Sequence, residues 1–135
     1  MADRPTLYLT NWSSRRLHGP GQKWTIMARP RAWERGAGVV VALTPDPSDL
    51  VAVKSGTLSE VEYFARFRAR MLRDSSQLAP GVMRAAYAVY PAVCDGDTLL
   101  CACAVGAPCH RREAAPFLVR AGWRVVLDGV EVTHG

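Results

Sequence analysis

Residues 97–129, DTLLCACAVGAPCHRREAAPFLVRAGWRVVLDG, read as a strand, a helix and a second strand in succession. The apolar runs at 98–103 and 123–128 predict strands, and the stretch 110–121 predicts a helix that Gly122 ends. A strand, a helix and a strand in this order predict a crossover between two parallel strands. This stretch therefore indicates an α/β protein.

The rest of the chain adds further elements of both kinds. The run VVVALTP at 39–45 is apolar throughout and bounded by turn residues, which is typical of a strand buried on both faces. Two other short strands are predicted at 6–10 and 24–28. Helices are predicted within 46–56, 58–74 and 80–90.

The longest predicted helix, within 58–74, carries the clearest local signals. Ser59 and Glu62 form the S-x-x-E pattern of a capping box. One apolar stripe is predicted to face the core: Val61, Phe64, Phe67 and Met71. Another face carries three arginines, which we expect to be solvated: Arg66, Arg70 and Arg73.

Size and element order together predict the fold class. The chain has 135 residues with 49% hydrophobic content, enough for one core of ordinary size. Strands alternate with helices, and several strands are apolar throughout. We therefore predict a single α/β domain over 1–135, with three layers, a mainly parallel sheet and a Rossmann-like arrangement.

Charge and hydropathy limit the kinds of partner and the cellular location that we expect. The chain carries 17 Lys+Arg and 12 Asp+Glu, a net charge of +5, and only Lys23 and Lys54 are lysines. Guanidinium groups bind phosphate and carboxylate in a bidentate manner, so an anionic partner is favoured. The apolar runs are too short to span a bilayer, and the first ten residues lack a signal-peptide pattern. We expect a cytoplasmic protein without membrane partners.

Polar loops follow two of the predicted strands. In open α/β sheets, ligands bind at the carboxyl ends of strands. If the loops after 6–10 and 98–103 adjoin, a small donor-rich site results. The predicted ligand-binding residues are Thr10, Asn11, Ser13, Arg15, Arg29 and Arg111, with Ser14 beside them.

The residues Cys109, His110 and Arg111 begin the last predicted helix. A helix N-terminus favours anions and lowers the pKa of a cysteine, so Cys109 is predicted as a partly ionised nucleophile. His110 is the matching candidate for proton transfer. The alternative is that Cys109 packs inward and His110 only caps the helix. Both interpretations remain open from the sequence.

A metal centre is the alternative chemistry for the same segment. Cys101, Cys103, Cys109 and His110 offer the sulfur and nitrogen ligands that zinc prefers. Their spacing differs from the usual C-x-x-C knuckles, so we expect no cofactor, with zinc as the alternative. Cys94 is predicted to be structural.

Aromatic and basic residues alternate within 12–35. They are Trp12, Arg15, Arg16, Lys23, Trp24, Arg29, Arg31, Trp33 and Arg35. Such a surface can stack bases and bind phosphates, which makes nucleic acid a possible partner. The alternative is that the tryptophans anchor a loop in the core while the basic residues are solvated.

Several of these pieces resemble the bacterial family catalogued as domain of unknown function 488. They are T-x-x-S at Thr10 and Ser13, Arg29-Pro30 after the second strand, the helix YFARFRARM, and Cys109-His110-Arg111 after a strand. CAC…PCHR also resembles an uncharacterised family with a cysteine-rich strand before C-H-G. The chain departs from the first family at Met27, Ala28 and Cys103, where carboxylates are usual. The resemblance implies an α/β fold and a shared polar site, without an established reaction.

Three hypotheses follow. The first is a small protein that binds or processes an anionic, nucleotide-like or phosphorylated ligand, with Cys109 and His110 as the catalytic pair. The second is a nucleic-acid-binding accessory protein that uses the Trp/Arg-rich face. The third is a zinc-stabilised protein-interaction domain. Whether the chain is an enzyme, and its oligomeric state, stay open.

Overall fold

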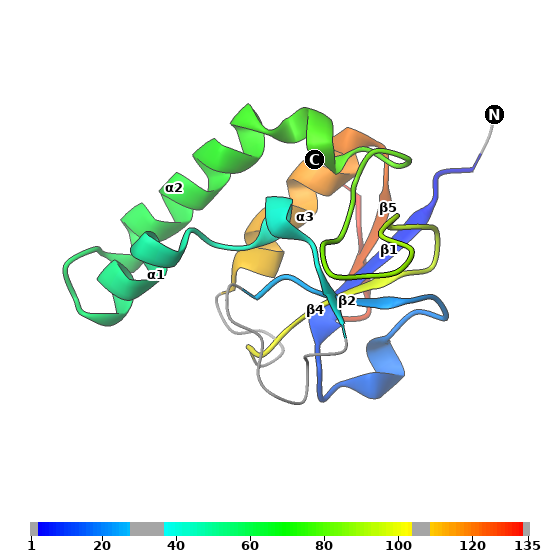
Figure 1. Cartoon of the computed structure of the whole chain (residues 1–135), viewed down its shortest axis with the longest axis horizontal. Coiled ribbons are helices and arrows are strands. Elements are labelled where there is room, and N and C mark those ends of the chain that lie inside the picture. The colour runs from blue at the N-terminus through cyan, green and yellow to red at the C-terminus, as the bar shows by residue number, and fades with distance from the viewer. Residues whose placement is uncertain (1–2, 28–36, 104–108, 134–135) are drawn as a thin grey trace.

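The computed structural model describes residues 3–27, 37–103 and 109–133, and within them the strands form one sheet (Figure 1). The strands are β1 (Thr6–Asn11), β2 (Lys23–Thr25), β3 (Gly38–Val39), β4 (Thr98–Cys101), β5 (Arg124–Leu127) and β6 (Val130–Val132). Their order is β3-β2-β4-β1-β5-β6, and every neighbouring pair is parallel except β5 and β6. The predicted α/β class with a mainly parallel sheet is confirmed.

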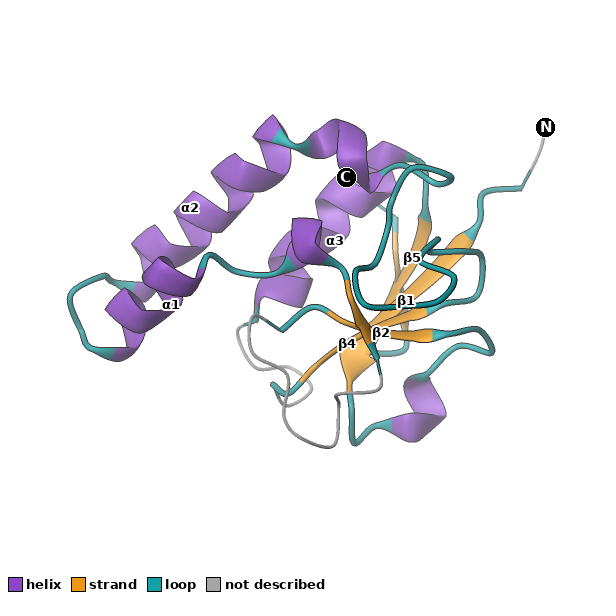
Figure 2. Cartoon of the chain, viewed as in Figure 1, coloured by secondary structure: helices purple, strands orange, loops and turns teal. Residues whose placement is uncertain are grey.

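The helices lie together to one side of the sheet (Figure 2). They are α1 (Pro47–Lys54), α2 (Glu60–Arg73) and α3 (His110–Ala121), with 3-10 turns η1 (Arg15–Leu17), η3 (Val41–Leu43) and η4 (Ser75–Leu78). Helix α3 packs on β1, β5 and β6, α2 packs on α3, and α1 packs on α2. The finer prediction of a three-layer, Rossmann-like arrangement is not confirmed. Within the described ranges, no helix is both long and apolar enough to cross a bilayer.

The crossover predicted from 97–129 is present as β4, α3 and β5. Strand β1 lies between β4 and β5, so the crossover spans one strand. Gly122 ends α3 in the left-handed conformation at φ 116°, where a side chain would be strained. Pro116 is accommodated inside the helix. The buried side of α3 is formed by Ala114, Ala115 and Leu118, together with His110 and Arg111 at its start.

Helix α2 begins as predicted but faces the core with a different stripe. The Ser59 hydroxyl accepts a hydrogen bond from the Glu62 backbone N–H at 3.1 Å. The buried residues are Tyr63, Phe67 and Met71. Val61 is 78% exposed, so its predicted burial is wrong. The i, i+4 spacing of the three buried residues defines a stripe that excludes Val61.

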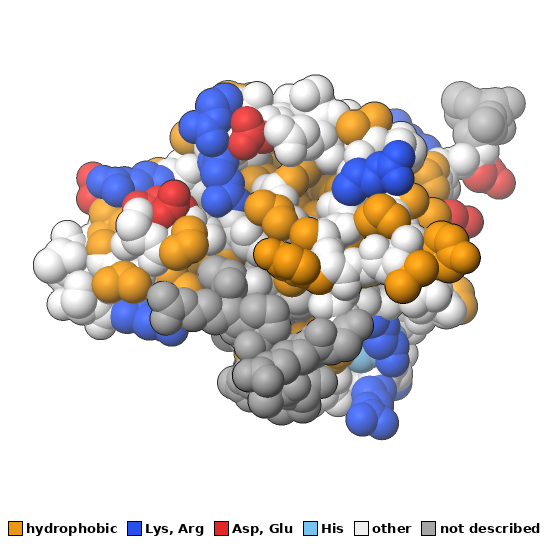
Figure 3. All heavy atoms as spheres, viewed as in Figure 1, with side chains coloured by type: hydrophobic (Ala, Val, Ile, Leu, Met, Phe, Trp, Pro, Cys, Tyr) orange, Lys and Arg blue, Asp and Glu red, His pale blue; other side chains and the backbone are white. Residues whose placement is uncertain are grey.

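Two predicted elements are wrong, and both lie at the edge of the sheet. Strand β3 covers only two residues before η3 begins, since the Thr44 hydroxyl donates to the Val41 carbonyl and closes a turn. The predicted helix at 80–90 is absent: Ala86 instead exchanges hydrogen bonds with Val39, and Tyr87 has a left-handed φ of 62° that a helix does not accept. Figure 3 shows hydrophobic side chains on the face where this segment runs. Strand β6 was not predicted.

A buried carboxylate fixes the turn before β4. Asp97 is 2% exposed and accepts hydrogen bonds from the Cys94 N–H, the Gln22 N–H and the Trp24 indole N–H, at 2.8, 2.8 and 2.9 Å. These bonds attach β2 to the start of β4. Since Trp24 is only 4% exposed, its ring belongs to the core.

Candidate functional site

The carboxyl ends of β1 and β4 lie side by side. Asn11, the last residue of β1, pairs with Cys101, the last residue of β4. The Trp12 N–H donates to the Cys101 carbonyl at 3.1 Å, which continues the pairing by one step. The cysteine-bearing strand therefore ends next to the first polar loop, at the edge where parallel sheets bind ligands.

Three cysteines gather where β4 ends and α3 begins. The Sγ atoms of Cys101, Cys103 and Cys109 all lie within 4.8 Å of one another, and we call these residues the cysteine cluster. The Cys101 and Cys109 sulfurs are 3.2 Å apart, and both residues are buried. Cys109 is the N-cap residue of α3, but its side chain makes no capping hydrogen bond. Its sulfur is directed to the cluster instead.

Arg111 supports the cysteine cluster from inside the protein. Its guanidinium is fully buried, and one nitrogen lies 2.7 Å from the Cys101 sulfur and 3.0 Å from the Cys103 carbonyl oxygen. The other terminal nitrogen donates to Asp128 at 3.1 Å. A buried guanidinium requires such charged and polar partners. Arg111 thus faces Cys101 and Asp128, which is a different position from the ligand contact predicted from sequence.

The pKa values of the two buried thiols, Cys101 and Cys109, are shifted in opposite directions. A hydrogen bond from Cys109, with the positive charge of Arg111 acting in the same direction, lowers the pKa of Cys101 to about 6. The same hydrogen bond to Cys101, together with burial, raises the pKa of Cys109 well above the usual range. These directions favour the thiolate on Cys101, whereas the sequence pattern predicted it on Cys109, and the role of Cys109 as nucleophile stays a prediction. The two thiols share a proton, and the contact between the Arg111 guanidinium and the Cys101 sulfur favours the negative charge on Cys101.

His110 is neutral, and one of its ring nitrogens is already engaged in a hydrogen bond. Its Nε2 lies 2.8 Å from the Ile26 carbonyl oxygen, which only accepts, so Nε2 carries the proton. Burial lowers the pKa of His110 to about 4. Its Nδ1 lies 3.6 Å from the Cys109 sulfur and presents a lone pair to it. The ring also packs edge-on against Phe67. His110 is therefore placed to exchange a proton with Cys109, and a catalytic role stays a prediction.

A pocket of about 320 Å³ opens onto the cluster, and we call it the cysteine pocket. It is lined by Met27, Pro45, Leu50, Lys54, Tyr63, Phe64, Cys101, Ala102, Cys103, Cys109 and His110. Most of these side chains are apolar or aromatic. Lys54 brings a positive charge, and burial raises the pKa of Tyr63 to about 12, which keeps its hydroxyl neutral. A small molecule in this pocket meets cysteine sulfur, aromatic rings and one lysine.

The residues predicted from the first loop do not line the cysteine pocket. The Asn11 side chain instead accepts hydrogen bonds from Ser14 N–H at 2.8 Å and from the Ser13 hydroxyl at 3.4 Å, which closes the loop on itself. Thr10 is fully buried, and Arg15 is exposed on η1. Arg29 lies outside the described residues.

The Trp/Arg-rich surface is only partly described. Trp24 is in the core and bonded to Asp97, so its ring is not available for stacking on a base. Trp12 is half-buried. Trp33, with Arg29, Arg31 and Arg35, falls outside the described residues. Nucleic-acid binding by this surface stays a prediction.

Several residues of the site were not found from sequence. Asp128 reaches Arg111 from the turn after β5, and Tyr63 and Phe64 line the cysteine pocket from α2. The Ile26 carbonyl reaches His110 from beyond β2. No local motif marks them, because their role depends on which elements pack together. Cys94 is exposed, its sulfur lies 3.5 Å from the Ala92 carbonyl oxygen, and its structural role stays a prediction.

The cysteine cluster is weakly compatible with a soft metal ion. Two sulfurs bound tetrahedrally to zinc lie about 3.8 Å apart, and the spread of the cluster brackets that value. His110 Nδ1 lies beside Cys109 but is not among the atoms that fall within 4.8 Å of one another. Its Nε2 bond to a backbone carbonyl is the outer contact usual for a ligating histidine.

No family model, curated protein or solved structure matches this chain.

Proposed function

We propose that this protein binds and processes a small anionic molecule in the cysteine pocket, with Cys101 as the nucleophile. The observation that carries the proposal is the 2.7 Å contact between the fully buried Arg111 guanidinium and the Cys101 sulfur, on the wall of that pocket. A cation at this distance favours the thiolate, which is the reactive form of cysteine. Lys54 adds a positive charge that favours a phosphorylated or nucleotide-like ligand.

The chemistry follows from the arrangement of the sulfurs. The Cys101 thiolate attacks an electrophilic carbon of the ligand, a carbon–sulfur bond forms, and the leaving group departs with the electron pair of the broken bond. Cys109, 3.2 Å away, holds a thiol proton that the leaving group can take, and His110 Nδ1 is placed to share it. The apolar lining limits the water that competes for the same carbon.

Alkylation across pH tests this proposal. We expect iodoacetamide to label Cys101 with a rate that rises through a midpoint near pH 6, because the pKa of that thiol is lowered to about 6. The site of labelling is read by peptide mass spectrometry. Cys101→Ser should abolish the low-pH labelling, while Cys94→Ser, which removes an exposed thiol, should leave it unchanged. Labelling of Cys101 only at alkaline pH, like Cys94, would contradict the proposal.

A second candidate function is binding of zinc by the cysteine cluster, because three sulfurs lie within 4.8 Å of one another. We expect, in that case, about one zinc per chain by elemental mass spectrometry, as one cluster holds one ion. Cys103→Ser should then lose the metal and Cys94→Ser should keep it. Metal-free protein with all four thiols titratable would exclude this function.

We also propose that the chain is related to the family catalogued as domain of unknown function 488. The support is the sequence Cys109-His110-Arg111, which follows β4 and opens α3.

A further inference from the structure

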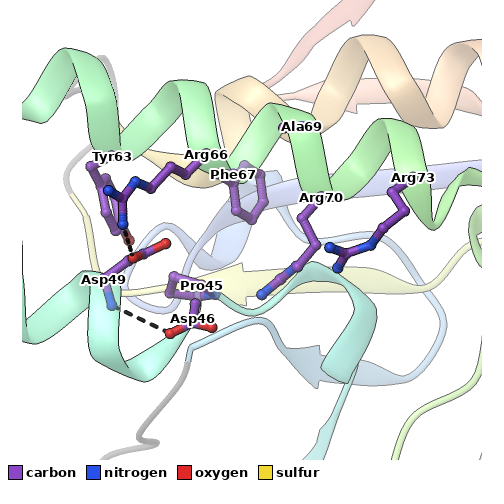
Figure 4. A pocket seen from close by; sticks show the side chains of 9 residues that line it. All are labelled: Pro45, Asp46, Asp49, Tyr63, Arg66, Phe67, Ala69, Arg70 and Arg73. Atoms are coloured by element: carbon purple, nitrogen blue, oxygen red, sulfur yellow. Dashed lines mark hydrogen bonds and ion pairs between the residues drawn. The ribbon is translucent and has the colours of Figure 1, made fainter.

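A second pocket, of about 450 Å³, lies between α1 and α2 (Figure 4), and we call it the arginine pocket. It is lined by Pro45, Asp46, Asp49, Tyr63, Arg66, Phe67, Ala69, Arg70 and Arg73. The three arginines come from successive turns of α2. Figure 4 shows the Arg70 and Arg73 side chains next to each other, both directed toward the start of α1.

The arginines differ in their partners. Arg66 pairs with Asp49 at 2.9 Å, and Arg73 pairs with Asp74 at 3.2 Å. Arg70 is half-buried and has no carboxylate within ion-pair distance among the described residues. Within the described part of the chain, Arg70 makes one long hydrogen bond, of 3.5 Å, to the Ala42 carbonyl. Its guanidinium is 5.6 Å from the Phe67 ring.

The carboxylates of the pocket are already engaged. Asp46 caps α1 by accepting hydrogen bonds from the Ser48 N–H, the Ser48 hydroxyl and the Asp49 N–H. Asp49 is held by Arg66. Burial lowers the pKa of Arg70, and the negative charges of Asp46 and Asp74 offset this only in part. An oxyanion beside Arg70 supplies the missing partner, since a guanidinium binds such groups through paired hydrogen bonds.

The two pockets share a wall. Pro45 and Tyr63 line both the arginine pocket and the cysteine pocket. A group bound at Arg70 is therefore next to the space that leads to Cys101. This neighbourhood suits a molecule with an anionic group at one end and a reactive carbon at the other.

We propose that the arginine pocket binds a phosphate group through Arg70 and Arg73, and that this phosphate belongs to the molecule with which Cys101 reacts. The second half of the statement rests on the proposed function. The first half stands on the arginine pocket alone. The substrate class is thus a small phosphate ester that carries a reactive carbon.

Titration with inorganic phosphate at constant ionic strength tests the first half. We expect saturable binding by calorimetry, weakened at least roughly tenfold in Arg70→Gln, because a charge-assisted hydrogen-bond pair is lost. Arg16→Gln, which removes the same charge from the exposed turn η1, is the matched control and should bind like the wild type. An unchanged thermal midpoint in both variants shows that the fold is kept. Absence of saturation in the wild type, or equal affinity in Arg70→Gln, would overturn the proposal.

Labelling with bromoethyl phosphate tests the second half. The Cys101 sulfur forms a carbon–sulfur bond and bromide leaves with the bonding electrons. We expect faster labelling than with bromoethanol, the same reagent without phosphate, and loss of this preference in Arg70→Gln. Phosphate binding without such a preference would overturn the link to Cys101. Low-pH iodoacetamide labelling of Cys101 without phosphate binding would overturn the arginine pocket and leave the proposed function standing.

Discussion

At the scale of single residues, the site depends on four buried groups whose charges and protons are coupled. Arg111 is held between Asp128 and Cys101, and it stabilises negative charge on the cysteine. Cys109 keeps the proton that the two thiols share. His110 stays neutral because Ile26 takes its only N–H and burial opposes a second proton. This division puts the reactive thiol on the strand and the proton donor on the helix.

The neutral state of His110 predicts how stability depends on pH. Its folded-state pKa is lowered from 6.5 to about 4, so the unfolded chain binds the proton first as the pH falls. We expect the free energy of unfolding to decrease between pH 6.5 and 4, by on the order of 3 kcal/mol in total.

Urea unfolding across that pH range measures this effect. His110→Gln keeps a donor for the Ile26 carbonyl and should lose this part of the slope. His18→Gln is the control for removing an imidazole elsewhere. An identical slope in the wild type and in His110→Gln would show that His110 does not titrate as described.

At the scale of elements, sequence signals that act within one helix or turn predicted the helix ends correctly. The Ser59 cap of α2 and the Gly122 stop of α3 were both readable. The strand predicted at 39–45 and the helix predicted at 80–90 are wrong because of a tertiary contact. Their backbones bond to each other through Val39 and Ala86, and an apolar run does not reveal such a choice.

In the turn before β4, we expect a small change of side chain to cause a large loss of stability. Asp97→Asn replaces one acceptor oxygen with an N–H₂ group that faces the donors of Gln22, Trp24 and Cys94. We expect a loss of about 2–4 kcal/mol in the free energy of unfolding, because a buried donor is left without an acceptor. Chemical denaturation measures the loss. Asp74→Asn, at a surface pair with Arg73, is the control and should cost less than about 1 kcal/mol.

At the scale of the whole molecule, the sequence located the centre of the site but not its surroundings. Cys101, Cys109, His110 and Arg111 could be named because they sit at the end of a readable strand and the start of a readable helix. Their roles could not, since the charge partner Asp128 and the lining from α2 come from distant parts of the chain.

The charged surface over α1 and α2 was likewise predicted only in part from the sequence. Figure 3 shows basic side chains interleaved with acidic ones over α1 and α2, where the sequence suggested a solvated arginine face. Beneath this mixture, Arg70 is half-buried and lines a pocket that adjoins the cysteine pocket. Both pockets are lined by residues of α1 and α2, and the cysteine pocket also by the end of β4. Any anionic ligand is therefore expected at this junction, away from the loop after β1.

The most direct test is a pH titration of Cys101 itself. The protein is labelled isotopically at cysteine, and nuclear magnetic resonance spectra report the protonation of each thiol through its Cβ chemical shift. The account predicts that the Cys101 signal, assigned with Cys101→Ser, titrates with a midpoint near pH 6, while the Cys109 signal does not move over the same range. A Cys101 signal that stays protonated up to the ordinary thiol pKa of about 8.5 would contradict it.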